Sequence, residues 1–272
     1  MRKFGNFVNI KCANSVKRSK NMSVKNLDNQ ILSVLASVET ISPDELAKKT
    51  DVSPSTVRRR VRNLCEKGLV KHTHGLVRLN RESNFTESFT FRKHRNSLEK
   101  KRIALEAVKL VKNGDVIFLD GSSSAFFIAQ YLDQFDDVKV ITNGIDTLSL
   151  LSQNKVNAYS TGGRVPQFNG SVLVDSFAID TIKRIHADIC FLSALTIDDD
   201  GNIWDTVEEE NSVRRELIAA SAVKVFLCDS SKLHKKSTFK MCSVCDFDYM
   251  VCDEDCSGDI NLCGCKLSVT PS

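Results

Sequence analysis

The stretch 51–70 contains four arginines within five positions, namely Arg58, Arg59, Arg60 and Arg62. A planar guanidinium can form two parallel hydrogen bonds with a phosphate, or with the O6 and N7 atoms of guanine. The apolar residues at positions 57, 61 and 64 have the i, i+4, i+7 spacing of one helix face, so they predict a helix that buries this stripe. The arginines then point away from the stripe, where they can contact a nucleic acid.

A second set of polar residues follows four apolar segments that predict β-strands. The stretch 120–124 (DGSSS) offers a glycine for close approach and three hydroxyls at a helix start, which suits a phosphate. The carboxyl ends of parallel strands meet at one edge of a sheet, where ligands bind. The candidate ligand-binding residues are therefore Asp120, Gly121, Ser122, Ser123, Ser124, Thr142, Asn143, Gly162, Gly163, Arg164 and Lys232.

The charge of the chain is distributed unevenly between these two sets. The net charge is +4, but residues 1–102 hold 23 lysines and arginines against 9 aspartates and glutamates. The remaining residues hold 15 against 25, so a basic part precedes an acidic one. This asymmetry favours a polyanion-binding module joined to a module with a different task, although two solvated surfaces of opposite sign would also produce it.

Helix signals place the arginines in a small N-terminal domain. Residues 27–38 have the apolar spacing of an amphipathic helix, and Ser42, Pro43 and Glu45 form a capping box with proline at the first helical position. Ser53 and Pro54 repeat this start before the arginine helix, and Gly68 is a helix stop. The stretch 69–79 predicts a β-hairpin that turns at 74–75. Three helices and a hairpin indicate a winged helix-turn-helix, which would place Ser55 and Thr56 beside the arginines at DNA.

The rest of the chain alternates apolar strands with amphipathic helices. This pattern predicts an α/β domain with a mainly parallel sheet that is covered on both faces. The predicted organisation is a basic disordered tail over 1–24, a winged helix-turn-helix over 25–80, a linker over 81–99, an effector domain over 100–255 and a Cys-rich tail over 256–272.

The stretch 27–80 resembles the winged-helix domain of the DeoR (deoxyribose operon repressor) family of bacterial transcription regulators. The family pattern Thr-Ile-Arg-Arg-Asp-Leu corresponds to residues 56–61 (TVRRRV), and its wing corresponds to residues 70–75 (VKHTHG). Arg60 stands where the family has aspartate, and Leu76 stands where it has a second glycine. We expect this extra cation to strengthen salt-dependent DNA binding. The resemblance implies DNA contacts from Ser53, Ser55, Thr56, Arg58, Arg59, Arg62, Lys71 and His74.

Residues 100–255 resemble the effector domain of the same family, which is related in fold to ribose-5-phosphate isomerase. The matching landmarks are Gly114-Asp115, Leu119-Asp120, Ser122-Ser123, Thr142-Asn143, Gly162-Gly163, Glu210 and Asp229-Ser230-Ser231-Lys232. The resemblance adds Glu210 to the candidate site and implies a phosphorylated sugar as effector. It implies a repressor of a carbohydrate-utilisation operon that binds double-stranded operator DNA as a homodimer or homotetramer.

Other functions are weighed against this interpretation. Asp120, Glu210 and Lys232 could serve a sugar-phosphate isomerase as acid, base and phosphate anchor, which is the alternative function. Cys242 and Cys245 have zinc-ligand spacing, but no second pair follows. The ten cysteines are expected to be reduced thiols in a cytoplasmic protein, since the chain shows no export signal and no run of about 18 apolar residues. We assign no catalytic residue, metal or cofactor.

Overall fold

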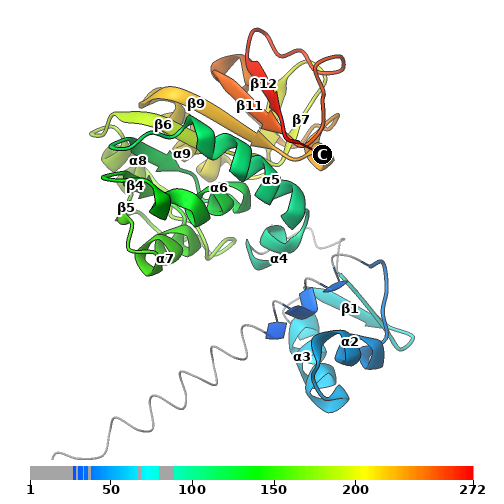
Figure 1. Ribbon diagram of the computed structural model, residues 1–272. Helices are drawn as coiled ribbons and strands as arrows, with labels where there is room; N and C mark the ends of the chain where they lie inside the picture. The colour runs from blue at the N-terminus through cyan, green and yellow to red at the C-terminus, as the bar shows by residue number, and fades with distance from the viewer. Residues whose placement is uncertain are drawn as a thin grey trace, which may run out of the picture. The chain divides into compact units, whose positions relative to one another are not determined.

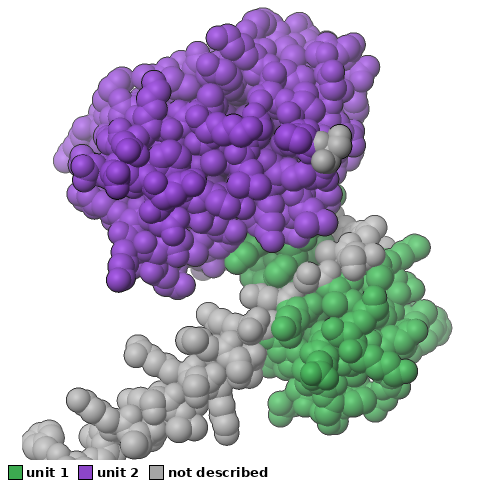
Figure 2. Space-filling model, in the orientation of Figure 1, with its two compact units in different colours: residues 1–95 green, residues 96–272 purple. Residues whose placement is uncertain are grey.

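The computed structural model describes residues 27–28, 30–32, 34–35, 38–66, 69–79 and 89–271, which fold into two compact units, 1–95 and 96–272 (Figure 2). The tail expected over 1–24, the helix stop expected at Gly68 and the residues 80–88 around the start of the expected linker lie outside this description. Within the described part of the chain, no helix is both long and apolar enough to span a membrane.

Unit 1 begins with helical turns among the described residues of 27–35 and continues into α2 (Pro43–Thr50) and α3 (Pro54–Glu66) (Figure 1). The predicted capping box is present, because the Ser42 side chain accepts from the Glu45 amide while the Glu45 carboxylate accepts from the Ser42 amide. The Ser53 hydroxyl accepts from the Thr56 amide at 3.4 Å in the same way. Both helices therefore start where the sequence predicts.

The hairpin of unit 1 pairs β1 (Val70–Thr73) with β2 (Leu76–Leu79) in antiparallel register. His74 and Gly75 form its turn with φ angles of 52° and 78°, and a two-residue type I′ turn requires positive φ at both positions. The predicted stripe of α3 is buried, with Val57, Val61 and Leu64 at most 1% exposed, and it packs on the first helix and on the hairpin.

The expected linker contains helical structure. α4 (Phe89–His94) buries Phe91 in the core of unit 1, and α5 (Ser97–Ala107) begins unit 2. Asn96 precedes α5 at φ 51° and forms no side-chain cap, so the start of this helix lacks the capping box that marks α2. The chain therefore passes from one unit to the other at Arg95 and Asn96.

Unit 2 is built on a seven-stranded sheet in which every hydrogen-bonded pair is parallel. Its order is β12-β11-β9-β6-β3-β4-β5. The strands are β3 (Val116–Leu119), β4 (Lys139–Thr142), β5 (Asn157–Ser160), β6 (Ala187–Leu192), β9 (Ser221–Cys228), β11 (Tyr249–Cys252) and β12 (Lys266–Val269). Successive strands run outwards from β3 to β5 and then from β6 to β12, so the strand order reverses between β3 and β6.

Helices cover both faces of this sheet, as the apolar strands predict (Figure 1). Along β3, Ile117 and Leu119 face one core and Phe118 faces the other, because successive side chains of a strand alternate. The first core packs against α5, α6 (Ser123–Ile128) and α7 (Ile145–Gln153), and the second against α8 (Ser176–Ile182) and α9 (Glu208–Ala219). The predicted fold, a winged helix-turn-helix followed by a mainly parallel α/β domain, is confirmed.

The C-terminal end of the chain differs from the prediction. Residues 256–272, expected to be a Cys-rich tail, contribute the edge strand β12 and the buried residues Cys256, Ile260 and Cys265. The sequence missed this strand because it is short and only half-buried. The sequence also did not predict a small antiparallel sheet, which consists of β10 (Phe239–Ser243), β8 (Asn202–Asp205) and β7 (Thr196–Ile197) in that order.

A disulfide joins Cys245 to Cys263, which are 18 residues apart in the chain. The expectation that all cysteines are reduced thiols is therefore wrong for this pair.

Candidate functional sites

The outer side of α3 carries the residues predicted to contact DNA. Ser53, Ser55, Arg58, Arg59 and Arg62 are exposed, and Thr56 is half-buried. This exposure follows from burial of the opposite stripe, since a helix with one apolar face must turn the remaining side chains outwards. In the hairpin that contacts α3, Lys71 is half-buried and His74 is exposed.

Arg58 and Arg60 have different partners within unit 1. Arg58 pairs with Asp44 at 2.8 Å, but both side chains are about 60% exposed, so the pair is weak and a phosphate can displace it. Arg60 donates from Nε to Asp28 at 2.7 Å and from a second nitrogen to the other carboxylate oxygen. Its side chain is only 14% exposed. The expectation that Arg60 adds a DNA-facing cation is therefore wrong, because Asp28 of the first helix holds it inside the domain.

The ligand edge predicted for unit 2 lies at the carboxyl ends of its parallel strands. Asp120 follows β3 and Ser193 follows β6, which are the two strands between which the order reverses. The Ser193 amide donates to Asp120 Oδ2 at 3.4 Å, and the Ser122 amide donates to Asp120 Oδ1 at 3.1 Å. Open parallel sheets bind ligands at such a reversal, because the connections there diverge to opposite faces and leave a crevice.

A buried arginine organises this edge. Arg214 of α9 donates to Asp120, Asp205 and Glu210, each at 3.0 Å, and its side chain is 5% exposed. Burial opposes the charge of Arg214, but Asp205, Glu210 and Asp120 outweigh it and raise the pKa of the guanidinium above its ordinary value. Arg214 is therefore a permanent cation among three carboxylates.

Lys232 approaches the same edge from the loop that follows β9. Its ammonium donates to Ser193 Oγ at 2.5 Å and lies 3.7 Å from Asp229 Oδ2. Burial opposes ionisation of Asp229, yet Lys232 and Lys100 lower the pKa of this carboxyl to about 2. The fold thus places a cation, a hydroxyl and two buried carboxylates next to the end of β6.

The predicted glycine and asparagine loops complete the edge. A Cβ on Gly121 would lie 2.5 Å from Val172 Cγ1, so only glycine fits there. Asn143 donates from Nδ2 to the Leu173 carbonyl at 3.0 Å, while its buried Oδ1 has no partner among the described residues. The Thr142 hydroxyl accepts from the Gly144 amide. Asn143 Oδ1 is therefore a free acceptor at this edge.

The remaining candidates divide between the α6 start and an exposed loop. Ser122, Ser123 and Ser124 are buried, and the Ser122 hydroxyl caps α6 by accepting from the Ala125 amide. Gly162 and Gly163 have positive φ, and a Cβ on Gly163 would lie 2.5 Å from the Val174 carbonyl. Arg164 is exposed and pairs with Glu209 at 2.9 Å, which ties its loop to the start of α9.

Four residues of this site were not predicted from the sequence, namely Ser193, Asp205, Arg214 and Asn169. The side-chain amide of Asn169 donates to Glu210. A signal for Arg214 was present. One face of α9 consists of positions 210, 213, 214 and 217, and its two apolar residues, Val213 and Leu217, are buried. A glutamate and an arginine four residues apart on an apolar face indicate a buried ion pair.

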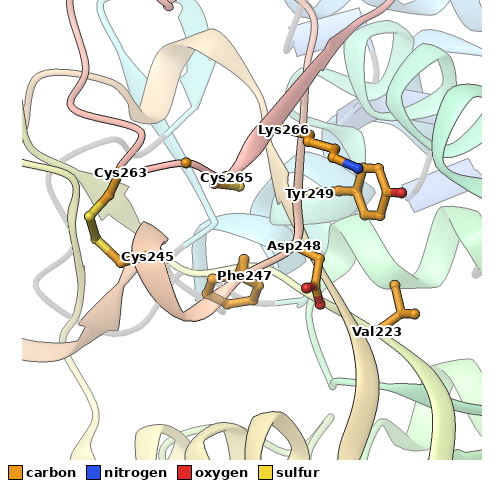
Figure 3. A pocket seen from close by; sticks show the side chains of 9 residues that line it. Val223, Cys245, Phe247, Asp248, Tyr249, Cys263, Cys265 and Lys266 are labelled. Atoms are coloured by element: carbon orange, nitrogen blue, oxygen red, sulfur yellow. A yellow bond between two sulfur atoms is a disulfide. The ribbon is translucent and has the colours of Figure 1, made fainter.

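A separate pocket of about 340 Å³ lies at the opposite, amino ends of β9, β11 and β12 (Figure 3). Tyr249, Lys266 and the Cys245–Cys263 disulfide line it, and no predicted ligand-binding residue does. Cys245 is thus bonded to Cys263 and does not pair with Cys242 as a zinc ligand. Among the residues that the structure describes, no group of three or more metal-ligating side chains is found.

An exposed arginine helix in a winged domain, joined to a parallel sheet with a cluster of polar and charged residues at its carboxyl edge, is typical of a DNA-binding transcription regulator with a sensor domain. Residues 95–254 match the family described as the DeoR C terminal sensor domain, and residues 25–71 match a winged helix-turn-helix DNA-binding family. The chain belongs to the DeoR family of transcription regulators.

Several known proteins are similar to this chain. The HTH-type transcriptional regulator GolR of Listeria innocua is 35% identical over 83% of this chain and 89% of its own length. The L-fucose operon activator of Haemophilus influenzae is 33% identical over 72% of this chain and 79% of its own length. The glycerol-3-phosphate regulon repressor of the same organism is 27% identical over 81% of this chain and 86% of its own length. All three are named as regulators, which favours a regulator over the isomerase alternative.

Among solved structures, ribose 5-phosphate isomerase A of Methanocaldococcus jannaschii resembles the chain with a TM-score of 0.39 and 21% identity. The match covers 51% of this chain and 55% of the isomerase. Asp120 and Glu210, the acid and base of the enzyme alternative, are both ion-paired with Arg214.

Proposed function

We propose that the chain represses a carbohydrate-utilisation operon by binding operator DNA, and that a phosphorylated sugar at the β3–β6 edge releases it. The observation that carries the proposal is that one chain joins an exposed arginine helix to a sheet edge where the Lys232 ammonium lies beside hydroxyl and amide groups. The relatives include one named activator and one named repressor, so the sign of regulation is part of the proposal.

The DNA contacts are assigned to α3 and the hairpin. In a winged helix-turn-helix the second helix of the motif enters the major groove, and the wing lies near the backbone. Arg58, Arg59 and Arg62 can contact base edges and phosphates from α3, with help from the hydroxyls of its first turn. Lys71 and His74 lie on the hairpin, where they can contact phosphates. One such helix covers a half-site, so a two-fold operator needs a homodimer or a homotetramer. We propose that this oligomer works in the cytoplasm.

The effector contacts are assigned to the carboxyl edge of the sheet of unit 2. The Lys232 ammonium is a point charge that suits a phosphate, and Ser123 and Ser124 supply hydroxyls at the start of α6. Asn143 Oδ1 can accept a hydrogen bond from a sugar hydroxyl. A hydroxylated anion matches this combination of one cation and several hydrogen-bonding groups.

Arg60 is expected to stabilise the winged domain without adding to its contacts with DNA. Arg60→Ala leaves the carboxylate of Asp28 without this guanidinium, so the free energy of unfolding should fall by about 1–3 kcal/mol. The slope of log K against log salt for DNA binding should stay unchanged, whereas Arg59→Ala should reduce it by about 1. The double variant Asp28→Arg/Arg60→Asp should regain part of the lost stability. A reduced salt slope in Arg60→Ala would show that Arg60 faces DNA.

Replacing the predicted phosphate anchor should separate DNA binding from its control. Lys232→Met is expected to keep operator affinity within about threefold while lowering sugar-phosphate affinity at least about tenfold, because a charged hydrogen bond contributes roughly 1.5–3 kcal/mol. The measurement is fluorescence anisotropy with DNA from upstream of the adjacent operon, titrated with ribose 5-phosphate, fructose 1-phosphate, fructose 6-phosphate and glycerol 3-phosphate.

Two further variants sharpen this test. Ser123→Ala should weaken the response in the same direction, and Lys236→Met is the matched control because Lys236 is 63% exposed and its ammonium pairs with Asp198 and Asp200, away from Asp229 and Ser193. If Lys232→Met responds to the same sugar phosphate as the wild type does, the phosphate binds elsewhere.

A further inference from the structure

The junction between the two units contacts the loop that carries the proposed effector anchor. Asn96 is the first residue of unit 2 and directly follows Arg95, the last residue of unit 1. It precedes α5 in a left-handed conformation with φ 51°, and its carbonyl accepts from the Lys100 amide at 3.0 Å. Asn96 is therefore joined directly, through the covalent chain, to the DNA-binding unit.

The Asn96 side chain is held by Asp229. Its amide donates to Asp229 Oδ1 and to Ser231 Oγ, both at 2.8 Å. Asp229 is 2% exposed, and its other oxygen faces the Lys232 ammonium. The low pKa of Asp229, near 2, keeps this carboxylate ionised at any physiological pH. Asp229 thus binds Asn96 at the junction through Oδ1 and faces Lys232, the proposed effector anchor, with Oδ2.

The connection continues to the centre of the sheet edge. Lys232 donates to Ser193 Oγ, and Ser193 follows β6 beside Asp120. A series of hydrogen bonds and one ion pair therefore runs from the interdomain junction to the carboxyl end of β6, through Asn96, Asp229, Lys232 and Ser193.

We propose that Asn96 is the positioning residue through which the effector controls the DNA-binding unit. The inference rests on the proposed function, because it takes Lys232 as the group that binds the phosphate. A phosphate on Lys232 competes with Asp229 for the same ammonium. Asp229 then depends more strongly on Asn96 and Ser231, so the bound and free states differ at the junction. Such a difference between states is what allows one ligand to change the affinity for another.

Asn96→Gly tests this coupling without straining the backbone, since glycine adopts positive φ readily and only the amide is lost. Asp137→Gly is the matched control, because Asp137 is also in the left-handed region at φ 56° but lies exposed before β4. Operator affinity is measured by anisotropy with and without saturating amounts of each of the four sugar phosphates named above, and their binding is measured by calorimetry.

We expect the most strongly bound sugar phosphate to change operator affinity about tenfold or more in the wild type and in Asp137→Gly. In Asn96→Gly the same sugar phosphate should change it less than about twofold, while each affinity measured alone stays within about threefold of wild type. A full response in Asn96→Gly overturns the inference, and so does a loss of operator affinity in the absence of any sugar phosphate, since that result indicates a purely structural role.

A second measurement needs no ligand and separates this inference from the proposed function. Amide hydrogen exchange at Lys100, whose N–H bonds to the Asn96 carbonyl, should change at least about threefold in Lys232→Met and should not change in Lys236→Met. If the wild type binds operator but ignores every sugar phosphate, the proposed effector is wrong, while altered exchange still supports the connection from Lys232 to Asn96. Unaltered exchange in Lys232→Met overturns that connection directly.

Discussion

Replacing Arg58 and Arg59 together by alanine is expected to abolish specific operator binding while the protein stays folded. Both side chains are exposed on α3, so their loss removes no buried contact. A bidentate contact to a base contributes about 1–3 kcal/mol, and two such losses lower affinity by roughly 30-fold to 10⁴-fold. Fluorescence anisotropy with operator and scrambled duplexes measures this loss, and thermal unfolding shows that the domain is intact.

The matched control for this pair lies in unit 2. Lys183→Ala/Arg184→Ala removes the same number of exposed cations and should leave operator affinity within about twofold. The salt dependence provides a further check, because each lost phosphate contact reduces the slope of log K against log salt by about 1. Specific binding by the Arg58/Arg59 double variant would mean that α3 is not the reading helix.

Arg214→Met is expected to destabilise unit 2 strongly. The guanidinium is 5% exposed and balances Asp120, Asp205 and Glu210, so methionine leaves three buried carboxylates without the cation that pairs with them. Breaking a buried ion pair by removing one partner costs about 3–5 kcal/mol. Chemical denaturation of wild type and variant, followed by circular dichroism, measures the change in the free energy of unfolding.

Arg215 supplies a control at the neighbouring position. Its side chain is 39% exposed and pairs with Glu208, which is itself half-exposed, so Arg215→Met should cost no more than about 1 kcal/mol. A large difference in the free energy of unfolding between Arg214→Met and Arg215→Met would establish that the loss of stability comes from the burial of Arg214 among carboxylates. The loss of a positive charge from α9 would then not be the cause. Equal stabilities of the two variants would contradict the role assigned to Arg214.

The position of each predicted element depends on short-range signals, and these proved reliable. The Ser42–Glu45 box, the Val57–Val61–Leu64 stripe and the His74-Gly75 turn each involve residues at most seven positions apart. The helix starts and the turn follow from local hydrogen bonding and backbone sterics, and the stripe follows from helical periodicity. The strands of unit 2 were recognisable for a similar reason, since buried parallel strands are continuous apolar runs.

The polar loops at the sheet edge were also visible, because residues that follow parallel strands must lie at one edge. The sequence could not show which of them touch. Ser193 and Asp120 are adjacent because β6 lies beside β3, although β4 and β5 come between them in the chain. That order is decided by how the helices pack on the two faces.

By itself, therefore, the sequence determined the class of the protein, its two kinds of domain and the stretches that carry its polar sites. Only the tertiary structure decided the partners of its charges. Arg60 meets Asp28 across 32 residues and Arg214 meets Asp120 across 94, so one expected DNA-facing cation is internal and an unexpected one organises the carboxyl edge of the sheet. The physical reason is that the energy of a charge depends on burial and on neighbours within a few ångströms, and distant segments supply both.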